Sequence, residues 1–202
     1  LFSVAIDGSA PRIQLNKPLP AGGSVATFQV SPDGALVVYC ADQDTDEAFE
    51  LYSVPIDGSA SPVKLNAPLG SGESAGGFDG FAITSDSTRV AFLVDQGHVE
   101  LHSAPIDGSA SPVVLSGTLG SDRDVEKFAL TPDGRRVVFL ADRDVDEVFE
   151  LYLAPMDGGH VPVQLNERLV PGGDVLHFVI APDSAHVVYL ADQDEDQRFE
   201  LF

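Results

Sequence analysis

The sequence predicts an all-β protein: a β-propeller of about four 50-residue blades, each a four-stranded antiparallel sheet. Three observations support this fold class. Leucine recurs every 50 residues, at Leu1, Leu51, Leu101, Leu151 and Leu201. A period of this length marks a repeat architecture, whose units stack because one unit cannot bury its own faces. Each unit also contains four short strand patterns without helical periodicity, which is typical of a propeller blade.

The first two strands of each unit are predicted on either side of a tight turn. Val25–Val30 precedes Ser31-Pro32-Asp33-Gly34, and proline followed by Asp-Gly favours such a turn. The copies of this first strand are Gly80–Ile83, Val125–Leu130 and Leu176–Ile180. The second strand is almost continuously apolar, as expected when both faces are covered. Its copies are Leu36–Ala41, Val90–Val94, Val137–Ala141 and Val187–Ala191.

The third strand alternates in polarity, and the fourth is short. Phe49, Leu51 and Ser53 share one face, and Asp57-Gly58-Ser59 then gives a hairpin signal before Pro62–Leu65. We interpret residues 1–202 as a single repeat array, with blade equivalents at 24–66, 77–115, 124–165 and 174–202, the last completed by 1–15. One blade is therefore split between the termini, which we expect in an excerpt or a permuted register of a longer array.

A family resemblance follows from these motifs. Ser31-Pro32-Asp33-Gly34, Val37-Val38-Tyr39, the acidic turn after them and Phe49-Glu50-Leu51-Tyr52 together resemble the TolB-like propeller repeat. The resemblance covers essentially the whole chain. Such propellers serve as binding platforms and as domains beside catalytic ones, so the resemblance implies a fold more than a function. The acidic turn is longer here than in that family, and only about four blades are present.

Charge and composition exclude several classes of partner. The formal net charge is −21, with 32 acidic and 11 basic residues. Nucleic acids and anionic membrane surfaces would be repelled, whereas cations and basic proteins would be attracted. No apolar run approaches the ~18 residues of a spanning helix, so no membrane span is expected. Cys40 is the only cysteine and aligns with leucines in the other units, which predicts a core residue.

The acidic turns suggest a calcium site. Three aspartates alternate after the second strand, with a further acid four residues later, and Ca²⁺ takes six to eight oxygen ligands. The spacing resembles the nine-residue calcium loops of integrin-type propellers. That resemblance implies side-chain ligands and one carbonyl per loop. The three sets are Asp42, Asp44, Asp46, Glu50 and the Ala48 carbonyl; Asp142, Asp144, Asp146, Glu150 and the Val148 carbonyl; and Asp192, Asp194, Asp196, Glu200 and the Arg198 carbonyl.

A second interpretation is a solvated turn whose charges oppose aggregation. Calcium loops favour glycine at the sixth position, where Glu47, Glu147 and Gln197 stand here. Glu100 also keeps the final acid although the second unit has lost the loop, which favours a role for that acid in the strand. Both interpretations stay open.

These patterns lead to three functional hypotheses. The first is a non-catalytic, Ca²⁺-binding module for protein interaction or assembly, in the periplasm or outside the cell, where calcium is abundant. The second is the propeller domain of a hydrolase or lyase, in which Thr27, Asp79, Lys127 and His177 would line the ring axis. The third is a structural protein that self-associates through the split blade. The residues do not decide whether the chain is an enzyme.

Overall fold

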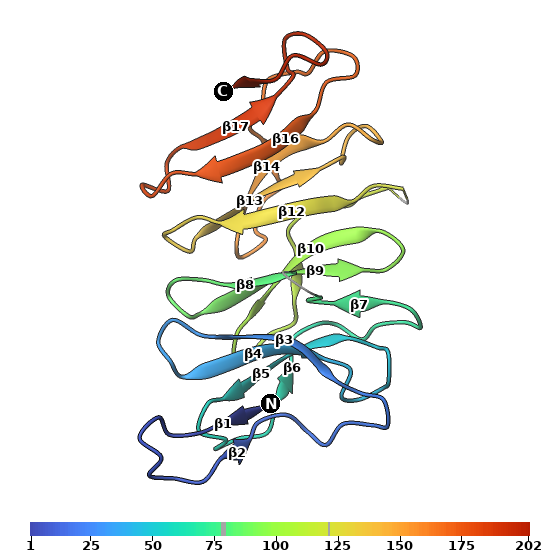
Figure 1. The fold of residues 1–202 in the computed structure, drawn as a ribbon. Helices are drawn as coiled ribbons and strands as arrows, with labels where there is room; N and C mark the ends of the chain where they lie inside the picture. Colours follow the sequence, from blue (N-terminus) through green and yellow to red (C-terminus); the bar gives the residue numbers. More distant parts are fainter. Residues whose placement is uncertain (78–79, 121) are drawn as a thin grey trace. The chain divides into compact units, whose positions relative to one another are not determined.

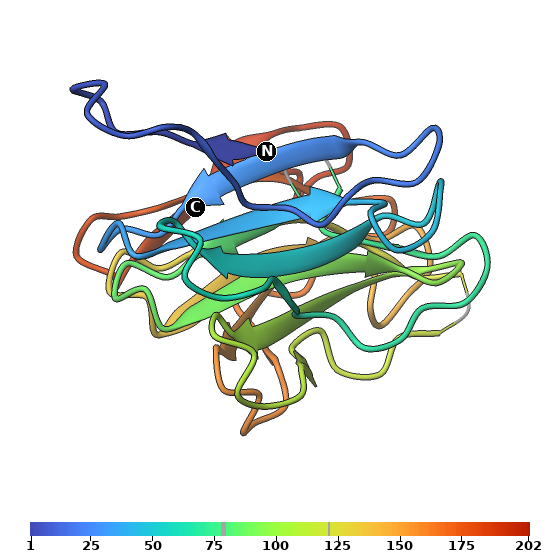
Figure 2. The same cartoon turned by 90° about the horizontal axis from the view of Figure 1, so that it is seen from below.

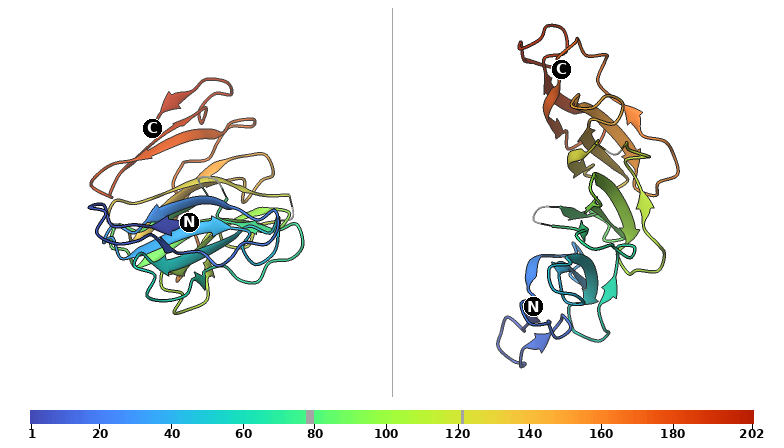
Figure 3. Two further views of the ribbon diagram at one scale, coloured as in Figure 1. Left: turned by 60° about the horizontal axis from the view of Figure 1, so that its bottom comes forward. Right: turned by 90° about the vertical axis from the view of Figure 1, so that its right-hand side faces the viewer.

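The computed structural model describes residues 1–77, 80–120 and 122–202, and every regular element in these ranges is a β-strand. The predicted all-β fold class is confirmed. Across the same residues, no helix has the length and apolar character needed to cross a membrane. The chain divides into two compact units, Leu1–Gln96 with Ala104–Pro112 and Gly97–Ser103 with Val113–Phe202, whose course can be followed by colour in Figure 3.

The first unit contains a hairpin, a four-stranded sheet and part of the next repeat. The hairpin lies beside the sheet (Figure 2), and its residues Leu1 and Leu15 pack against Val37 and Tyr39 of that sheet. The hairpin is β1 (Phe2–Ser3) and β2 (Ile13–Gln14), and the sheet is β3 (Val25–Val30), β4 (Leu36–Ala41), β5 (Glu50–Pro55) and β6 (Val63–Lys64), in that order (Figure 1). After them, β7 (Ser74–Ala75) and β8 (Phe81–Ile83) both pair with β9 (Arg89–Asp95).

The second unit repeats this arrangement. β10 (Val99–Pro105), most of which belongs to this unit, pairs with β11 (Val113–Val114). A four-stranded sheet follows, with β12 (Val125–Leu130), β13 (Arg136–Ala141), β14 (Glu150–Pro155) and β15 (Val163–Gln164) in order. A three-stranded sheet contains β16 (Val175–Ile180), β17 (Val187–Ala191) and β18 (Glu200–Leu201). The predicted strand positions are confirmed, with ends displaced by one or two residues.

Equivalent sheets have the same register. In the first, third and fourth repeats, the ladder between the first two strands shifts by one residue at a β-bulge, between Val25 and Thr27 in the first. The next ladder places Tyr39 opposite Tyr52, with ring centroids 5.4 Å apart and stacked. Phe139 and Tyr152 form the same pair at 5.5 Å. These stacked cross-strand pairs help fix the register of each sheet.

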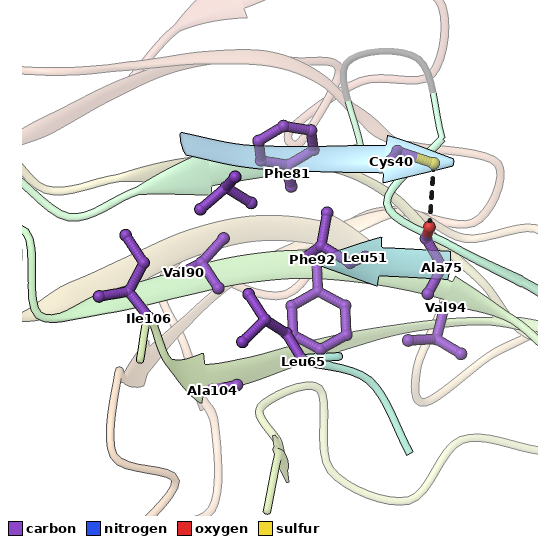
Figure 4. Close-up of a cluster of buried hydrophobic side chains, with 11 residues drawn as sticks. Cys40, Leu51, Leu65, Ala75, Phe81, Val90, Phe92, Val94, Ala104 and Ile106 are labelled. Atoms are coloured by element: carbon purple, nitrogen blue, oxygen red, sulfur yellow. Dashed lines mark hydrogen bonds between the residues drawn. The ribbon is translucent and has the colours of Figure 1, made fainter. Parts of the chain in front are cut away.

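The core of the first unit lies between its two successive repeats. Val38, Cys40 and Leu51 pack in one cluster with Phe81 and Phe92 of the following repeat (Figure 4). Cys40 is fully buried, as predicted for a core residue, and its Sγ lies 3.4 Å from the Ala75 carbonyl oxygen. Burial, helped by the nearby Asp42 carboxylate, raises the pKa of this thiol to about 12, which keeps it protonated and unreactive.

The second repeat keeps the 50-residue period by two compensating changes. The interval Ala75–Phe81 is three residues longer than Val25–Phe28, and it breaks the first strand into β7 and β8. The interval Leu93–Leu101 is three residues shorter than Cys40–Leu51, because the acidic turn is reduced to a tight one. The gain and the loss cancel, so strands after the second turn return to the common numbering.

Glycine in the Asp-Gly turns is required three times, at Gly58, Gly108 and Gly158, and at Gly108, with φ +67°, an added Cβ would collide with Val63. Gly58 has φ +65°, and a Cβ at this position would lie 2.5 Å from Cγ2 of Ile13 in the preceding outer strand. Gly158 has φ +70°, and its Cβ would lie 2.9 Å from Cγ2 of Val113. Both the left-handed conformation and the close approach therefore select a residue without a side chain. Each turn closes on the outer strand of the repeat before it.

Candidate functional site

The first aspartate of each acidic turn is a buried structural residue. Asp42, Asp142 and Asp192 are 3%, 4% and 1% exposed. In each, Oδ1 accepts a hydrogen bond from the backbone N–H that precedes the first strand, and Oδ2 accepts one from the sixth residue of the turn. The donors are Ser24 and Glu47 for Asp42, Asp124 and Glu147 for Asp142, and Asp174 and Gln197 for Asp192. These bonds fix the turn to the sheet.

The sixth residue of each turn has a left-handed backbone. Glu47, Glu147 and Gln197 have φ values of 63°, 59° and 62°. A non-glycine residue in this conformation costs on the order of 1 kcal/mol. The bond from its N–H to the buried aspartate offsets that cost. The expected sharp bend at the sixth position is therefore present, although glycine is not.

In the first repeat, lysines neutralise the later carboxylates. Lys64 Nζ lies 3.1 Å from Asp44 Oδ2 and 2.7 and 2.6 Å from the two oxygens of Glu50, and Lys17 Nζ lies 3.1 Å from Asp44 Oδ1. Although partial burial opposes the change, the hydrogen bonds from these lysines hold the pKa of Asp44 below its ordinary value. Glu50 also accepts a 2.9 Å bond from the Tyr52 hydroxyl. Glu50 thus connects its own strand, β5, to the outer strand β6 through Lys64.

In the third repeat, the equivalent carboxylates, Asp144 and Glu150, have different partners. Glu150 accepts bonds of 2.8 Å from the Tyr152 hydroxyl and 2.7 Å from Gln164 Nε2, and Gln164 stands at the strand position of Lys64. The Tyr152 hydroxyl is also 3.3 Å from Asp144 Oδ2. Burial, followed by the Glu150 carboxylate, raises the pKa of Tyr152. Arg143 is 3.8 Å from Asp144 Oδ1, too far for a direct hydrogen bond.

In the fourth repeat, the later carboxylates are exposed. Arg198 bridges Glu195 and Glu200 at 3.1 and 3.2 Å, while Asp194 and Asp196 face solvent. The N–H groups of Ala48, Val148 and Arg198 close the turns on the carbonyls of Thr45, Val145 and Glu195.

The predicted ligand sets are not gathered into metal sites. Within residues 1–77, 80–120 and 122–202, no three His, Cys, Asp or Glu side chains are grouped in a way that could hold a metal ion. The structure brings Asp44 and Glu50 together around Lys64, and Asp144 and Glu150 together around Tyr152. Calcium binding stays a prediction.

Lys17 and Lys64 were missed in the sequence, because only the pairing of Tyr52 with Lys64 brings residue 64 beside Glu50. Gln43 was missed as well. It is 4% exposed, and its Oε1 accepts bonds from the Tyr39 hydroxyl and the Lys17 N–H. The recurrence of a polar residue directly after the buried aspartate, as Arg143 and Gln193, is the one signal that could have indicated it.

The inner strands hold a second group of polar residues. Thr27, Lys127 and His177 lie at equivalent positions beside the β-bulges of β3, β12 and β16. Lys127 Nζ donates a 2.8 Å bond to the Leu176 carbonyl and lies 3.5 Å from Nδ1 of His177. Asp79, predicted in the same set, lies outside the described residues.

The fold is similar to several solved structures. A puromycin-hydrolysing peptidase of Mycobacterium tuberculosis matches with a TM-score of 0.61 at 16% identity, over 97% of this chain and 32% of that one. A putative dipeptidyl aminopeptidase IV of Bacteroides ovatus matches with a TM-score of 0.59 at 14% identity, over 92% and 34%. A putative TolB of Agrobacterium tumefaciens has a TM-score of 0.35 at 14% identity, over 89% and 76%.

The chain spans about a third of the length of the two peptidases, and at these identities the likeness concerns the fold alone. The TolB match is too weak to carry an assignment, so the TolB-like repeat type stays a prediction. No protein-family model matches the sequence, and no curated protein sequence matches it. The antiparallel four-stranded sheets and the propeller domains among the similar structures together identify the fold of this chain as a β-propeller.

Proposed function

We propose that the chain is a non-catalytic β-propeller module that presents acidic turns to cationic partners. This proposal rests on one observation, namely that buried and exposed residues of each turn have different roles. A buried aspartate fixes the backbone, whereas residues 44–47, 144–147 and 194–197 stay exposed. Negative groups held on a rigid scaffold, in a chain of net charge −21, attract cations and basic surfaces without a cost of ordering the loop.

The more specific part of this proposal is that the bound cation is Ca²⁺ and that the chain works outside the cytoplasm. The left-handed sixth residue and its bond to the first aspartate support a calcium-loop backbone. Lys17 and Lys64 occupy the acids of the first turn, so the third and fourth turns are the better candidates.

Calorimetric melting in calcium and in chelator tests the calcium part. We expect a higher melting temperature with Ca²⁺, and loss of part of that increase, the share of the fourth turn, in Asp194→Asn combined with Asp196→Asn. Asp44→Asn is the matched control, because its carboxylate already has two lysine partners. Equal melting temperatures in calcium and in chelator would remove Ca²⁺ and leave a module for basic partners.

The propeller domain of a hydrolase is the second candidate. Two of the similar structures are peptidases, and Lys127 and His177 lie together at the bulges of β12 and β16. A screen of chromogenic ester and peptide substrates against the chain tests this candidate. Turnover that His177→Ala abolishes would replace the non-catalytic proposal. Self-association through the split blade stays a separate prediction, which light scattering over a concentration series would check.

A further inference from the structure

The first and third repeats contain the same acceptor group around different occupants. In the first repeat, Asp44 and Glu50 surround the Lys64 ammonium, whose Nζ lies 3.1, 2.7 and 2.6 Å from three carboxylate oxygens, and the Tyr52 hydroxyl donates a hydrogen bond to Glu50. The same Nζ lies 5.7 Å from the centre of the Tyr52 ring. Three N–H donors facing three acceptor oxygens is the full complement of a primary ammonium.

The third repeat keeps the acceptors and lacks the lysine. Asp144, Glu150 and Tyr152 replace the acceptors one for one, and neutral Gln164 replaces Lys64. Gln164 Nε2 and the Tyr152 hydroxyl donate to Glu150, but each carboxylate oxygen can accept a further bond. Arg143 Nη1 remains 3.8 Å from Asp144, with its guanidinium 5.6 Å from the Tyr152 ring. Two carboxylates are thus left without an ammonium partner.

The carboxylates of the third repeat lie at the wall of a hollow. Asp144, Glu150 and Gln164, together with the cationic Arg168, line a hollow of about 600 Å³ between the third acidic turn and the segment 168–172. Glu150 is partly buried and accepts a bond from the hydroxyl of the fully buried Tyr152, so the sheet fixes the position of this carboxylate in the hollow. Concave sites with a few convergent polar groups are where ligands bind.

We infer that this hollow binds a primary ammonium group, in particular the lysine side chain of a basic protein partner, in the position that Lys64 takes in the first repeat. The Lys64 contacts provide the independent observation, since equivalent residues of the same chain already hold such a group. The hollow supplies the room, and Asp144 and Glu150 supply two negative charges against the one positive charge of Arg168 in the same lining. This inference deepens the proposed interaction module by giving the chemistry of its partner, and it rests on that proposal for the biological occupant.

The probe is Nα-acetyl-lysine-N-methylamide, titrated into the full 202-residue chain at low ionic strength and followed by NMR. We expect saturable shifts at Gln164 and Tyr152, with a millimolar dissociation constant. The matched probe carries an acetyl group on Nε, which removes the charge while keeping the length. Saturable binding of the charged probe alone supports the inference. Binding of both probes alike, or of neither, overturns it.

Two reciprocal variants locate the site. Gln164→Lys places the chain's own ammonium in the hollow and is expected to weaken probe binding at least tenfold. Lys64→Gln vacates the first repeat and is expected to add a second site, with shifts at Tyr52. Unchanged affinity in a folded Gln164→Lys chain would overturn the inference. Calcium melting curves on the same samples separate the two proposals. If the melting temperature does not depend on Ca²⁺ but the charged probe still binds, the calcium proposal fails and the lysine inference stands.

Discussion

The first and third repeats have nearly the same backbone but differ in how their charges are neutralised. Asp42 and Asp142 make the same two bonds to N–H groups, and Asn66 and Asn166 accept equivalent bonds from Leu51 and Leu151. The differences lie in a few edge residues: Lys64 is replaced by Gln164, Lys17 by Gly117, and Gln43 by Arg143. Buried contacts therefore define the blade, whereas edge positions vary its chemistry.

The largest effect is expected from the contacts that the two repeats share. Asp42→Ala and Asp142→Ala should each lower the free energy of unfolding by about 3 kcal/mol, because two backbone N–H groups lose their acceptor in a buried place. Urea titrations of both variants measure this. Asp46→Ala, at an exposed position of the same turn, is the control and should change stability by less than about 0.5 kcal/mol. Clearly unequal losses for Asp42 and Asp142 would show that the blades are not equivalent.

The contact between successive repeats comes next. Gly58→Ala should cost about 2 kcal/mol, because the new Cβ adopts a left-handed backbone and collides with Ile13. Gly8→Ala is the matched control, with φ +68° and nothing within 4 Å of the added Cβ, and should cost about 1 kcal/mol. Thermal melts of the pair separate the steric part from the conformational part. Equal costs would mean that Ile13 moves aside freely.

The charge difference itself should have a smaller effect on stability. Lys64→Gln should destabilise the chain by about 1 kcal/mol, since Glu50 is buried and loses two bonds, while the partial exposure of Lys64 limits the loss. Gln164→Lys should stabilise it by less than that. Denaturation at low and high salt tests the cause, because an ionic contribution shrinks as salt increases. A loss that does not depend on salt would point to packing.

The smallest effect on stability is expected from lowering the pH. Hydrogen bonds from Ser31 and Thr131, and from the backbone two residues on, lower the pKa values of Asp33 and Asp133. A carboxyl with a lowered folded-state pKa stabilises the protein above its unfolded-state value, and this contribution is lost as the pH falls through the folded-state value. Stability should therefore decline below about pH 4. Asp33→Asn and Asp133→Asn should each make the pH dependence shallower by the same amount, as followed by urea midpoints between acid and neutral pH.

The sequence was sufficient for the fold and insufficient for the site, for a physical reason. A 50-residue period and alternating polarity follow from burial, which acts at every repeat, so strands such as Leu36–Ala41 were predicted with their observed bounds. The partners of the acidic residues depend on register. Glu50 and Lys64 are 14 residues apart and meet only through a two-residue strand pairing. The sequence also did not reveal that each oxygen of the first aspartate accepts a bond from a backbone N–H group, because the donors lie 18 residues before and 5 residues after it; its role as a calcium ligand stays a prediction.

The glycines of the Asp-Gly turns at Gly58 and Gly158 also bear on how such an array changes by duplication or loss of units. A Cβ on Gly58 would collide with Ile13, and one on Gly158 with Val113, so one sheet carries the turn and the preceding outer strand carries the surface that receives it. A recombination with its break between two sheets would place a turn against the outer strand of a repeat that it did not originally follow. The segment that can be inherited intact therefore runs from one outer strand to the following turn, and its boundaries fall inside the sheets.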